Sequence, residues 1–113
     1  MNALFICSRN RLRSPTAQAV FASWENVETD SAGTSADADI EVSADHIDWA
    51  DTIFVMEGRH RALLAKRFQR QLKGKQVICL EIRDNYTFMQ PELIEILIAK
   101  VGRHLHSPKA SLQ

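Results

Sequence analysis

The sequence has only two cysteines, no net charge and no long apolar run, and each shortage excludes a class of protein. Cys7 and Cys79 are too few for a disulfide framework or a four-cysteine zinc site. The 14 basic and 14 acidic residues cancel, so no overall field attracts nucleic acid or an anionic membrane. No apolar segment approaches the roughly 20 residues of a membrane span, and the first residues lack the basic leader of a secretory signal. We therefore expect a cytoplasmic protein with reduced thiols that binds neither nucleic acid nor a membrane.

The chain length allows one small domain. Its 113 residues, 45% hydrophobic and 25% charged, have the composition of an ordinary globular protein. The sequence shows no internal repeat, no domain linker and no coiled-coil heptads. We expect a domain over residues 1–106 that acts as a monomer or weak dimer, and a flexible C-terminal tail over 107–113.

Short apolar runs alternate with segments of helical periodicity. The runs that predict strands are residues 4–6, 27–31, 52–56 and 77–80. The segments that predict helices are 14–24, 43–48, 57–72 and 91–105, with a polar, flexible stretch at 35–41. Ser14 and Pro15 are typical of a cap and a first helical residue. Since the strands are apolar throughout, they predict an α/β domain, with a parallel four-stranded sheet covered by helices on both faces.

A loop of eight residues joins the first predicted strand to the first predicted helix. It reads Cys7-Ser8-Arg9-Asn10-Arg11-Leu12-Arg13-Ser14. A loop in this place aims backbone N–H groups and the positive end of a helix at one point, where a phosphate binds and a thiolate is stabilised. Ligands of open α/β sheets bind at the carboxyl ends of the strands, where Cys7 stands. The sequence therefore predicts a phosphate-binding loop with Cys7 as nucleophile.

The other residues of this loop have side chains that fit a phosphate site. The guanidinium fork of Arg13 can bind two phosphate oxygens. Ser14 can donate a hydrogen bond to the cysteine sulfur, and Asn10 tolerates a left-handed backbone and can tie loop amides together. We expect no metal and no cofactor, because Arg13 and the loop amides supply the positive charge that a metal would provide.

The loop resembles that of the low-molecular-weight protein tyrosine phosphatases, which reads Cys-x-x-Asn-x-x-Arg-Ser-Pro. The positions that match are Cys7, Asn10, Arg13, Ser14 and Pro15. Residues 30–34 resemble the family's Ser-Ala-Gly-Thr turn, and residues 50–57 resemble its strand that ends in Met-Asp. The resemblance implies a four-stranded parallel sheet, attack of Cys7 on phosphorus, and stabilisation of the equatorial oxygens by Arg13.

The family keeps its general acid in an Asp-Pro-Tyr element after the last strand, and Asp84-Asn85-Tyr86 stands in that place. The resemblance implies that Asp84 protonates the leaving group and later acts as base on the hydrolytic water. The alternative is a loop aspartate that helps a turn. Tyr86 either lines the pocket, as the resemblance implies, or is an exposed loop aromatic.

The chain departs from the family at several positions. Arg9 replaces a residue that is usually small; with Arg11 it either adds positive charge at the pocket mouth or projects into solvent. Leu12 replaces a second loop cysteine, so no neighbouring thiol can protect Cys7. The regions 33–51 and around Asp84 are short, which affects the pocket walls and hence phosphotyrosine specificity. The substrate-binding residues that we predict are Ser8, Arg9, Asn10, Arg11, Leu12, Ser14 and Tyr86.

The sequence thus predicts a cysteine-dependent phosphomonoesterase with catalytic residues Cys7, Arg13 and Asp84. Its expected substrate is a phosphorylated protein, on tyrosine, or a small aryl phosphate. The alternatives are a phosphate- or partner-binding protein without chemistry and, less favoured, an arsenate reductase, which needs resolving cysteines where only Cys79 remains. The basic residues of the predicted helix 57–72 are interpreted as a solvated face; they are Arg59, His60, Arg61, Lys66, Arg67 and Arg70.

Overall fold

The computed structural model describes residues 1–105 and has four parallel strands in the order β2-β1-β3-β4. The strands are β1 (Asn2–Cys7), β2 (Glu28–Gly33), β3 (Thr52–Val55) and β4 (Gln76–Cys79). Each lies within two residues of a strand predicted from the sequence. The predicted fold class, a single α/β domain with a parallel four-stranded sheet, is confirmed.

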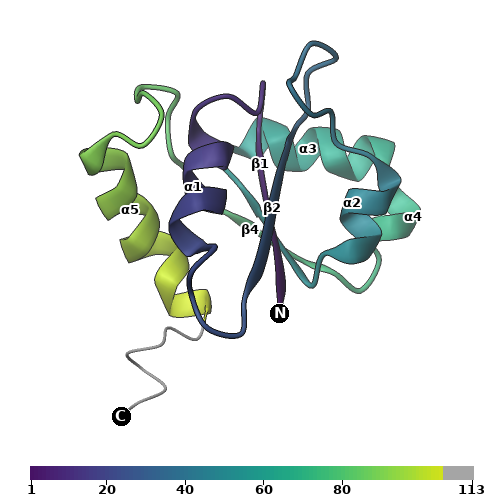
Figure 1. The fold of residues 1–113 in the computed structure, drawn as a ribbon. Coiled ribbons are helices and arrows are strands. Elements are labelled where there is room, and N and C mark those ends of the chain that lie inside the picture. The colour runs from purple at the N-terminus through teal and green to yellow at the C-terminus, as the bar shows by residue number, and fades with distance from the viewer. Residues whose placement is uncertain (106–113) are drawn as a thin grey trace.

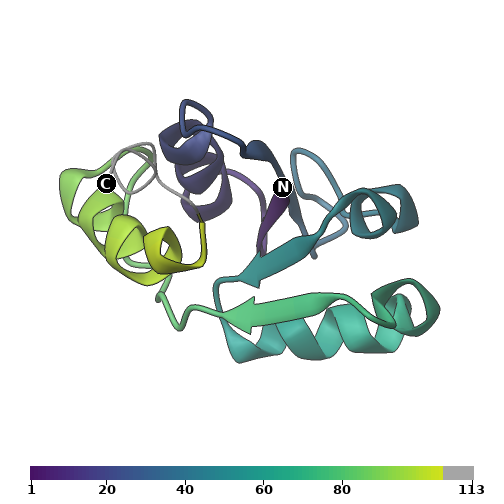
Figure 2. The same cartoon turned by 90° about the horizontal axis from the view of Figure 1, so that it is seen from below.

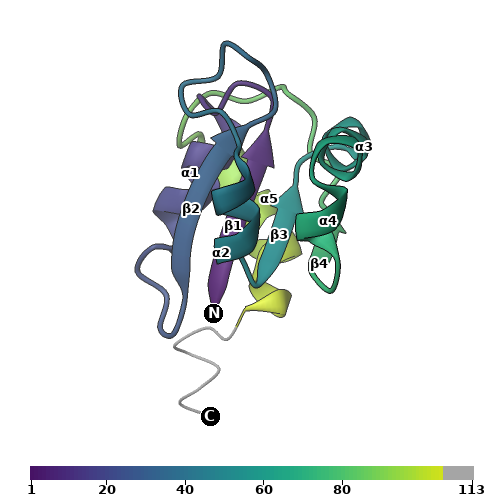
Figure 3. The ribbon, with the colours of Figure 1, turned by 90° about the vertical axis from the view of Figure 1, so that its right-hand side faces the viewer.

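Helices cover both faces of the sheet (Figure 1). On one face lie α1 (Arg13–Phe21) and α5 (Pro91–Val101), which is followed by the short 3-10 helix η1 (Gly102–His104). On the other face lie α2 (Ala44–Trp49), α3 (Gly58–Arg67) and α4 (Gln69–Leu72), which stand in front of the sheet in Figure 3. Strand β4 runs alongside α3, as Figure 2 shows. No helix among residues 1–105 is long and apolar enough to cross a membrane.

Alternate residues of β1 contribute to two separate cores. Ala3, Phe5 and Cys7 belong to the cluster beneath α1 and α5, whereas Leu4 and Ile6 belong to the cluster beneath α2, α3 and α4. All five side chains are buried, which is why the strand reads as continuously apolar. Cys7 is the last residue of this buried strand, so the backbone that leaves it is held by both layers.

The order of the strands creates a crevice at one end of the sheet. The neighbouring strands β1 and β3 are followed by helices on opposite faces, α1 and α3, and their connections separate at this point. Ligands of open α/β sheets bind at such a switch point, outside the carboxyl ends of the strands. The loop 7–14 lies there after β1, Glu57 follows β3 and Asp84 follows β4.

The first helix begins and ends earlier than the sequence predicts. It begins at Arg13, and the prediction that Ser14 is its cap is wrong. Ser14 lies within the first turn, and its hydroxyl contacts Cys7 instead of a helical amide. The helix ends at Phe21, because the amide of Trp24 donates to the carbonyl of Phe21 at 3.1 Å and closes a turn.

The helix predicted over residues 57–72 is two helices, α3 and α4. They meet at Phe68, whose φ of −127° and ψ of 36° are not helical. The break lets the side chains of both Phe68 and Leu72 pack against the core beneath α2, α3 and α4. The last predicted helix is also shorter, because α5 ends at Val101 and η1 follows. The predicted tail, 107–113, lies outside the described residues.

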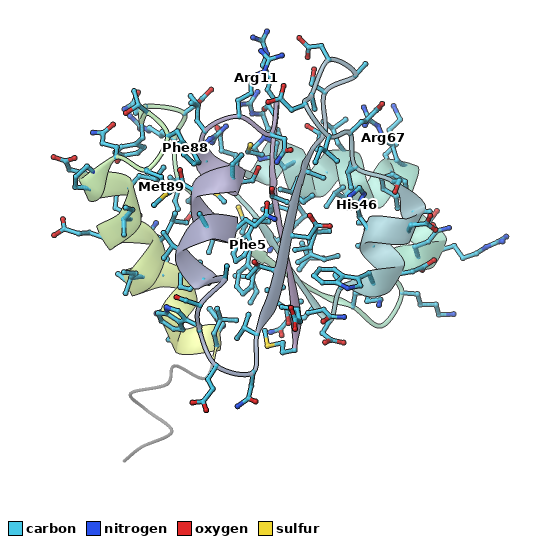
Figure 4. All side chains as sticks on the ribbon, in the orientation of Figure 1. Phe5, Arg11, His46, Arg67, Phe88 and Met89 are labelled. Atoms are coloured by element: carbon cyan, nitrogen blue, oxygen red, sulfur yellow. The ribbon has the colours of Figure 1, made fainter. Side chains whose placement is uncertain are left out.

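We expect Phe5→Ala to lower the free energy of unfolding by about 3–5 kcal/mol. Phe5 is fully buried between α1 and the sheet, with its ring centroid 5.8 Å from that of Phe21 and 5.2 Å from that of Phe54 (Figure 4). Urea denaturation measures the change. Phe88→Ala, at a side chain that is 53% exposed, is the control and should cost under about 1 kcal/mol. Equal losses in the two variants would contradict this packing.

Candidate active site

The carbonyl groups at the start of the loop 7–14 face the segment that follows β2. Three backbone bonds hold them there, from Thr34 N to Cys7 O (3.0 Å), Ser35 N to Ser8 O (2.9 Å) and Asp39 N to Arg9 O (3.0 Å). The N–H of a trans peptide points opposite to its carbonyl, and no peptide bond among the described residues is cis. The N–H group of each of these three peptides therefore points to the opposite side, away from this segment, and can bind an oxygen of an anion there.

Gly33 allows this close approach of the two segments. A Cβ atom at this position would stand 2.5 Å from the carbonyl oxygen of Ser8 and 2.7 Å from Cβ of Ala38, which is a steric clash. The glycine of the Ser-Ala-Gly-Thr turn is thus required by contact with the loop. The hydroxyl of Ser31 in the same turn accepts a hydrogen bond from Asn10 at 2.9 Å.

Asn10 and Ser14 form a hydrogen-bond chain that ends on the cysteine sulfur. Asn10 has a φ of 57°, in the left-handed region, and its side-chain amide donates to Ser14 Oγ at 3.0 Å. Ser14 Oγ lies 2.9 Å from Cys7 Sγ. Because the hydroxyl oxygen accepts from Asn10, its own proton is free to be donated to the sulfur, as a thiolate requires.

Arg13 is buried, and one edge of its guanidinium is already occupied. Both protons of Nη1 are donated, to Glu57 Oε2 and to the carbonyl of Ile82, each at 2.6 Å. Nε lies 3.6 Å from Asp84 Oδ1. Nε and Nη2 donate no hydrogen bond within residues 1–105, and their edge, with Asp84 paired at Nε, is the one that can bind two oxygens of a phosphate.

A pocket opens above these groups. It is lined by Cys7, Ser8, Arg9, Arg11, Leu12, Arg13, Arg59 and Asp84. Arg11 is paired with the segment 35–39, since its side chain donates to Asp39 Oδ1 at 3.0 Å and to the carbonyl of Asp37 at 3.2 Å (Figure 4). Four of the lining residues are arginines and one is acidic, so the pocket wall itself carries mainly positive charge.

Glu57 forms an ion pair with Arg13. Burial opposes ionisation of Glu57, but hydrogen bonds from Arg13 and Arg59 outweigh it, and the pKa of Glu57 falls below its usual 4.5. The carboxylate is therefore charged at neutral pH and holds the guanidinium at the bottom of the pocket. Since the side chain of Arg13 is only 1% exposed, this partner also offsets the cost of burying its charge.

His60 is fully buried beside the loop, although it lies in the first turn of α3. Its Nε2 lies 2.9 Å from Ser8 Oγ, and its Nδ1 accepts the backbone N–H of Glu57 at 3.0 Å. Burial lowers the pKa of His60 from 6.5 to about 4, and the guanidinium groups of Arg13 and Arg59 act in the same direction. The imidazole is neutral at pH 7.

Known structures share this architecture. The YwlE arginine phosphatase from Geobacillus stearothermophilus is 23% identical, with a TM-score of 0.72 over 93% of this chain and 92% of its own. The low molecular weight phosphotyrosine phosphatase VcLMWPTP-2 from Vibrio cholerae O395 is 19% identical, with a TM-score of 0.73 over 92% and 95%. The tyrosine phosphatase Wzb from Escherichia coli K30, in complex with phosphate, is 17% identical, with a TM-score of 0.72 over 91% and 94%.

The chain has the fold of the low-molecular-weight protein tyrosine phosphatases. The resemblance inferred from the loop 7–14 is thereby confirmed at the level of the fold. No family model matches the sequence, and no curated protein matches it.

Most residues that the sequence assigns to the site of this phosphatase fold lie around one pocket. Asn10 and Ser14 are buried behind the lining and shape it, whereas Arg9 and Leu12 line it directly. Tyr86 is different. Its side chain packs against the core cluster beneath α1 and α5 and is not among the lining residues. Contact between Tyr86 and substrate remains a prediction.

The start of α3 contributes three site residues that the sequence analysis missed. The interpretation of this helix as a solvated basic face is wrong for His60, which is buried; Arg59 is exposed as interpreted, but it also lines the pocket. Glu57 was not predicted at all. A weak signal was present, since Glu57 and His60 stand at the N-cap and N3 positions of a helix that follows a buried strand.

We expect the unfolding free energy to fall by about 3 kcal/mol as the pH drops from 6.5 to 4, through His60 alone. In this window the unfolded chain protonates His60, whose pKa is 6.5 there, while the folded protein, with a pKa of about 4, does not. Urea denaturation at several pH values measures the slope. His60→Asn should flatten it, and an unchanged slope would contradict a buried neutral imidazole.

Proposed function

We propose that this protein is a cysteine-dependent phosphomonoesterase that hydrolyses aryl phosphates, with phosphotyrosine of a protein as the substrate. The observation that carries the proposal is the chain from Asn10 through the Ser14 hydroxyl to Cys7 Sγ, in the same pocket as the Nε and Nη2 groups of Arg13, which donate no hydrogen bond within residues 1–105. Such an arrangement places a nucleophile next to donors for the three equatorial oxygens of phosphorus. The fold supports the proposal, since the similar structures are those of phosphatases.

The first step forms an S–P bond between Cys7 and phosphorus and breaks the P–O bond to the phenol. Asp84, which lines the pocket and lies 3.6 Å from Arg13 Nε, donates its proton to the departing phenolate oxygen. In the second step the Asp84 carboxylate removes a proton from water, whose oxygen attacks phosphorus. The S–P bond breaks, the thiolate of Cys7 returns, and inorganic phosphate leaves.

The charge of the pocket mouth favours an aryl phosphate over phosphoarginine. Arg9, Arg11 and Arg59 line the pocket, while the carboxylates that pair with Arg9 and Arg11, those of Asp37 and Asp39, are not among its lining residues. A guanidine that leaves from phosphoarginine becomes cationic when it is protonated, and these arginines repel it. A phenol leaves without positive charge and meets no such repulsion.

Two other functions fit the chain less well. An arsenate reductase needs a second thiol that reaches Cys7, but Cys79 lies on β4, which is separated from β1 by β3, and packs on the opposite face of the sheet. A binding protein without chemistry would need only the loop and Arg13. The presence of Asp84 at the pocket favours the enzyme over this alternative.

We expect Cys7→Ser to lower the rate of para-nitrophenyl phosphate hydrolysis by at least about 1,000-fold, because the nucleophile is lost. Asp84→Asn should lower kcat by about 100-fold or more, and by more with phenyl phosphate, whose phenolate is the poorer leaving group. Asp48→Asn, at an exposed residue of α2, is the matched control. A Cys7→Ser variant as active as wild type would refute the proposal.

We expect phosphotyrosine peptides flanked by glutamate to have a higher kcat/KM than peptides of equal length flanked by lysine. Arg11→Ala should reduce this preference by about two- to fivefold, the range for one exposed charge pair, and added salt should reduce it further. Arg103→Ala, exposed on η1, is the control. Faster hydrolysis of phosphoarginine peptides than of either phosphotyrosine peptide would contradict the substrate assignment.

A further inference from the structure

His60 and Ser8 form a buried polar contact that the proposed mechanism does not use. His60 Nε2 lies 2.9 Å from Ser8 Oγ, and Ser8 is one of the residues that line the pocket. His60 is fully buried, so this imidazole forms hydrogen bonds within the protein and not with bulk water. The effect of this contact on the pocket depends on which of the two atoms, His60 Nε2 or Ser8 Oγ, donates the proton.

The second contact of the imidazole answers this question. The backbone N–H of Glu57 donates to His60 Nδ1 at 3.0 Å, so Nδ1 accepts with its lone pair and carries no proton. A neutral imidazole carries one ring proton, which must then lie on Nε2. Nε2 therefore donates to Ser8 Oγ, and the serine oxygen is the acceptor.

This direction determines what the hydroxyl of Ser8 can do. Because its oxygen accepts from His60, its proton cannot point back along the same line and turns elsewhere. The backbone carbonyl of Ser8 is already bound by the amide of Ser35, on the side away from the pocket. The open direction for the proton is the pocket, where an anion would accept it.

We propose that His60 is a positioning residue that presets the Ser8 hydroxyl as a hydrogen-bond donor to a phosphoryl oxygen; this inference rests on the proposed function. The same arrangement, a serine hydroxyl that accepts from a side-chain N–H group, occurs at both ends of the loop. Asn10 donates to the Ser14 hydroxyl, which is thereby aimed at the sulfur, and His60 donates to the Ser8 hydroxyl, which is aimed at the phosphate. Each hydroxyl is oriented by a fixed donor before substrate arrives.

His60 also helps to cap the start of α3, and the chain contains a matched control for this second role. His46 stands at the N3 position of α2 as His60 does in α3, and its Nδ1 accepts the backbone N–H of Ser43 at 3.0 Å. His46 lies on α2 (Figure 4) and is not among the pocket residues. His46→Asn therefore measures the effect of changing such a cap, while His60→Asn changes the cap and also removes the donor to Ser8.

Binding of inorganic phosphate, measured by calorimetry, tests the proposal without requiring turnover. Ser8→Ala should raise the Kd about 10- to 100-fold, the range for one hydrogen bond to a charged group. Ser8→Thr, which keeps the hydroxyl, should stay within about threefold of wild type. His60→Asn should raise the Kd about three- to tenfold, because the hydroxyl remains but is free to rotate. His46→Asn should leave the Kd unchanged.

The double variant Ser8→Ala/His60→Asn gives the sharpest outcome. If His60 acts through Ser8, the loss in the double variant equals that of Ser8→Ala alone. Additive losses, an unchanged Kd in Ser8→Ala, or equal effects of His60→Asn and His46→Asn would overturn the proposal, as would a wild type that binds no phosphate. A wild type that binds phosphate but hydrolyses no aryl phosphate would refute the proposed function. The comparison of Kd values would then still test whether His60 orients Ser8.

Discussion

The site depends on the three backbone hydrogen bonds that attach the loop 7–14 to the segment after β2. They turn the carbonyls of the loop away from the pocket, and the amides that follow are thereby left for an anion. The contact is possible only because Gly33 has no side chain. A strand end, a glycine turn and a helix start thus combine to make a positively polarised hollow before any side chain contributes.

Side chains then add charge and direction to this hollow. Arg13 is held by Glu57 and the carbonyl of Ile82, which both bind Nη1, while Nε and Nη2 face Asp84 and can bind a phosphate. The hydroxyl groups of Ser8 and Ser14 each accept from a buried partner. Preorganised donors of this kind stabilise the charge of a transition state without a cost of reorganisation during the reaction.

The sequence predicted the parts of the site that are adjacent in the chain and, through the family resemblance, Asp84, which also lines the pocket. Cys7 and Arg13 lie on one loop, whose position between a buried strand and a helix could be recognised locally. Glu57 and His60 could not be recognised in this way, because their roles arise only when the start of α3 packs against that loop. The basic pattern of α3 was misleading for the same reason. Its first turn faces the site, while exposed residues such as Lys66 lie further along the helix.

The central claim is that phosphorus is transferred to Cys7, and trapping that intermediate tests it most directly. Asp84→Asn protein is mixed with para-nitrophenyl phosphate, denatured rapidly and digested, and its peptides are analysed by mass spectrometry. Loss of the base that activates water should slow the second step, so the intermediate accumulates. We expect one added phosphoryl group on the peptide that contains Cys7, and none in Cys7→Ala, which has no side-chain atom that can accept it. Phosphoryl transfer to another residue, or turnover by wild type without any trapped phosphopeptide, would contradict it.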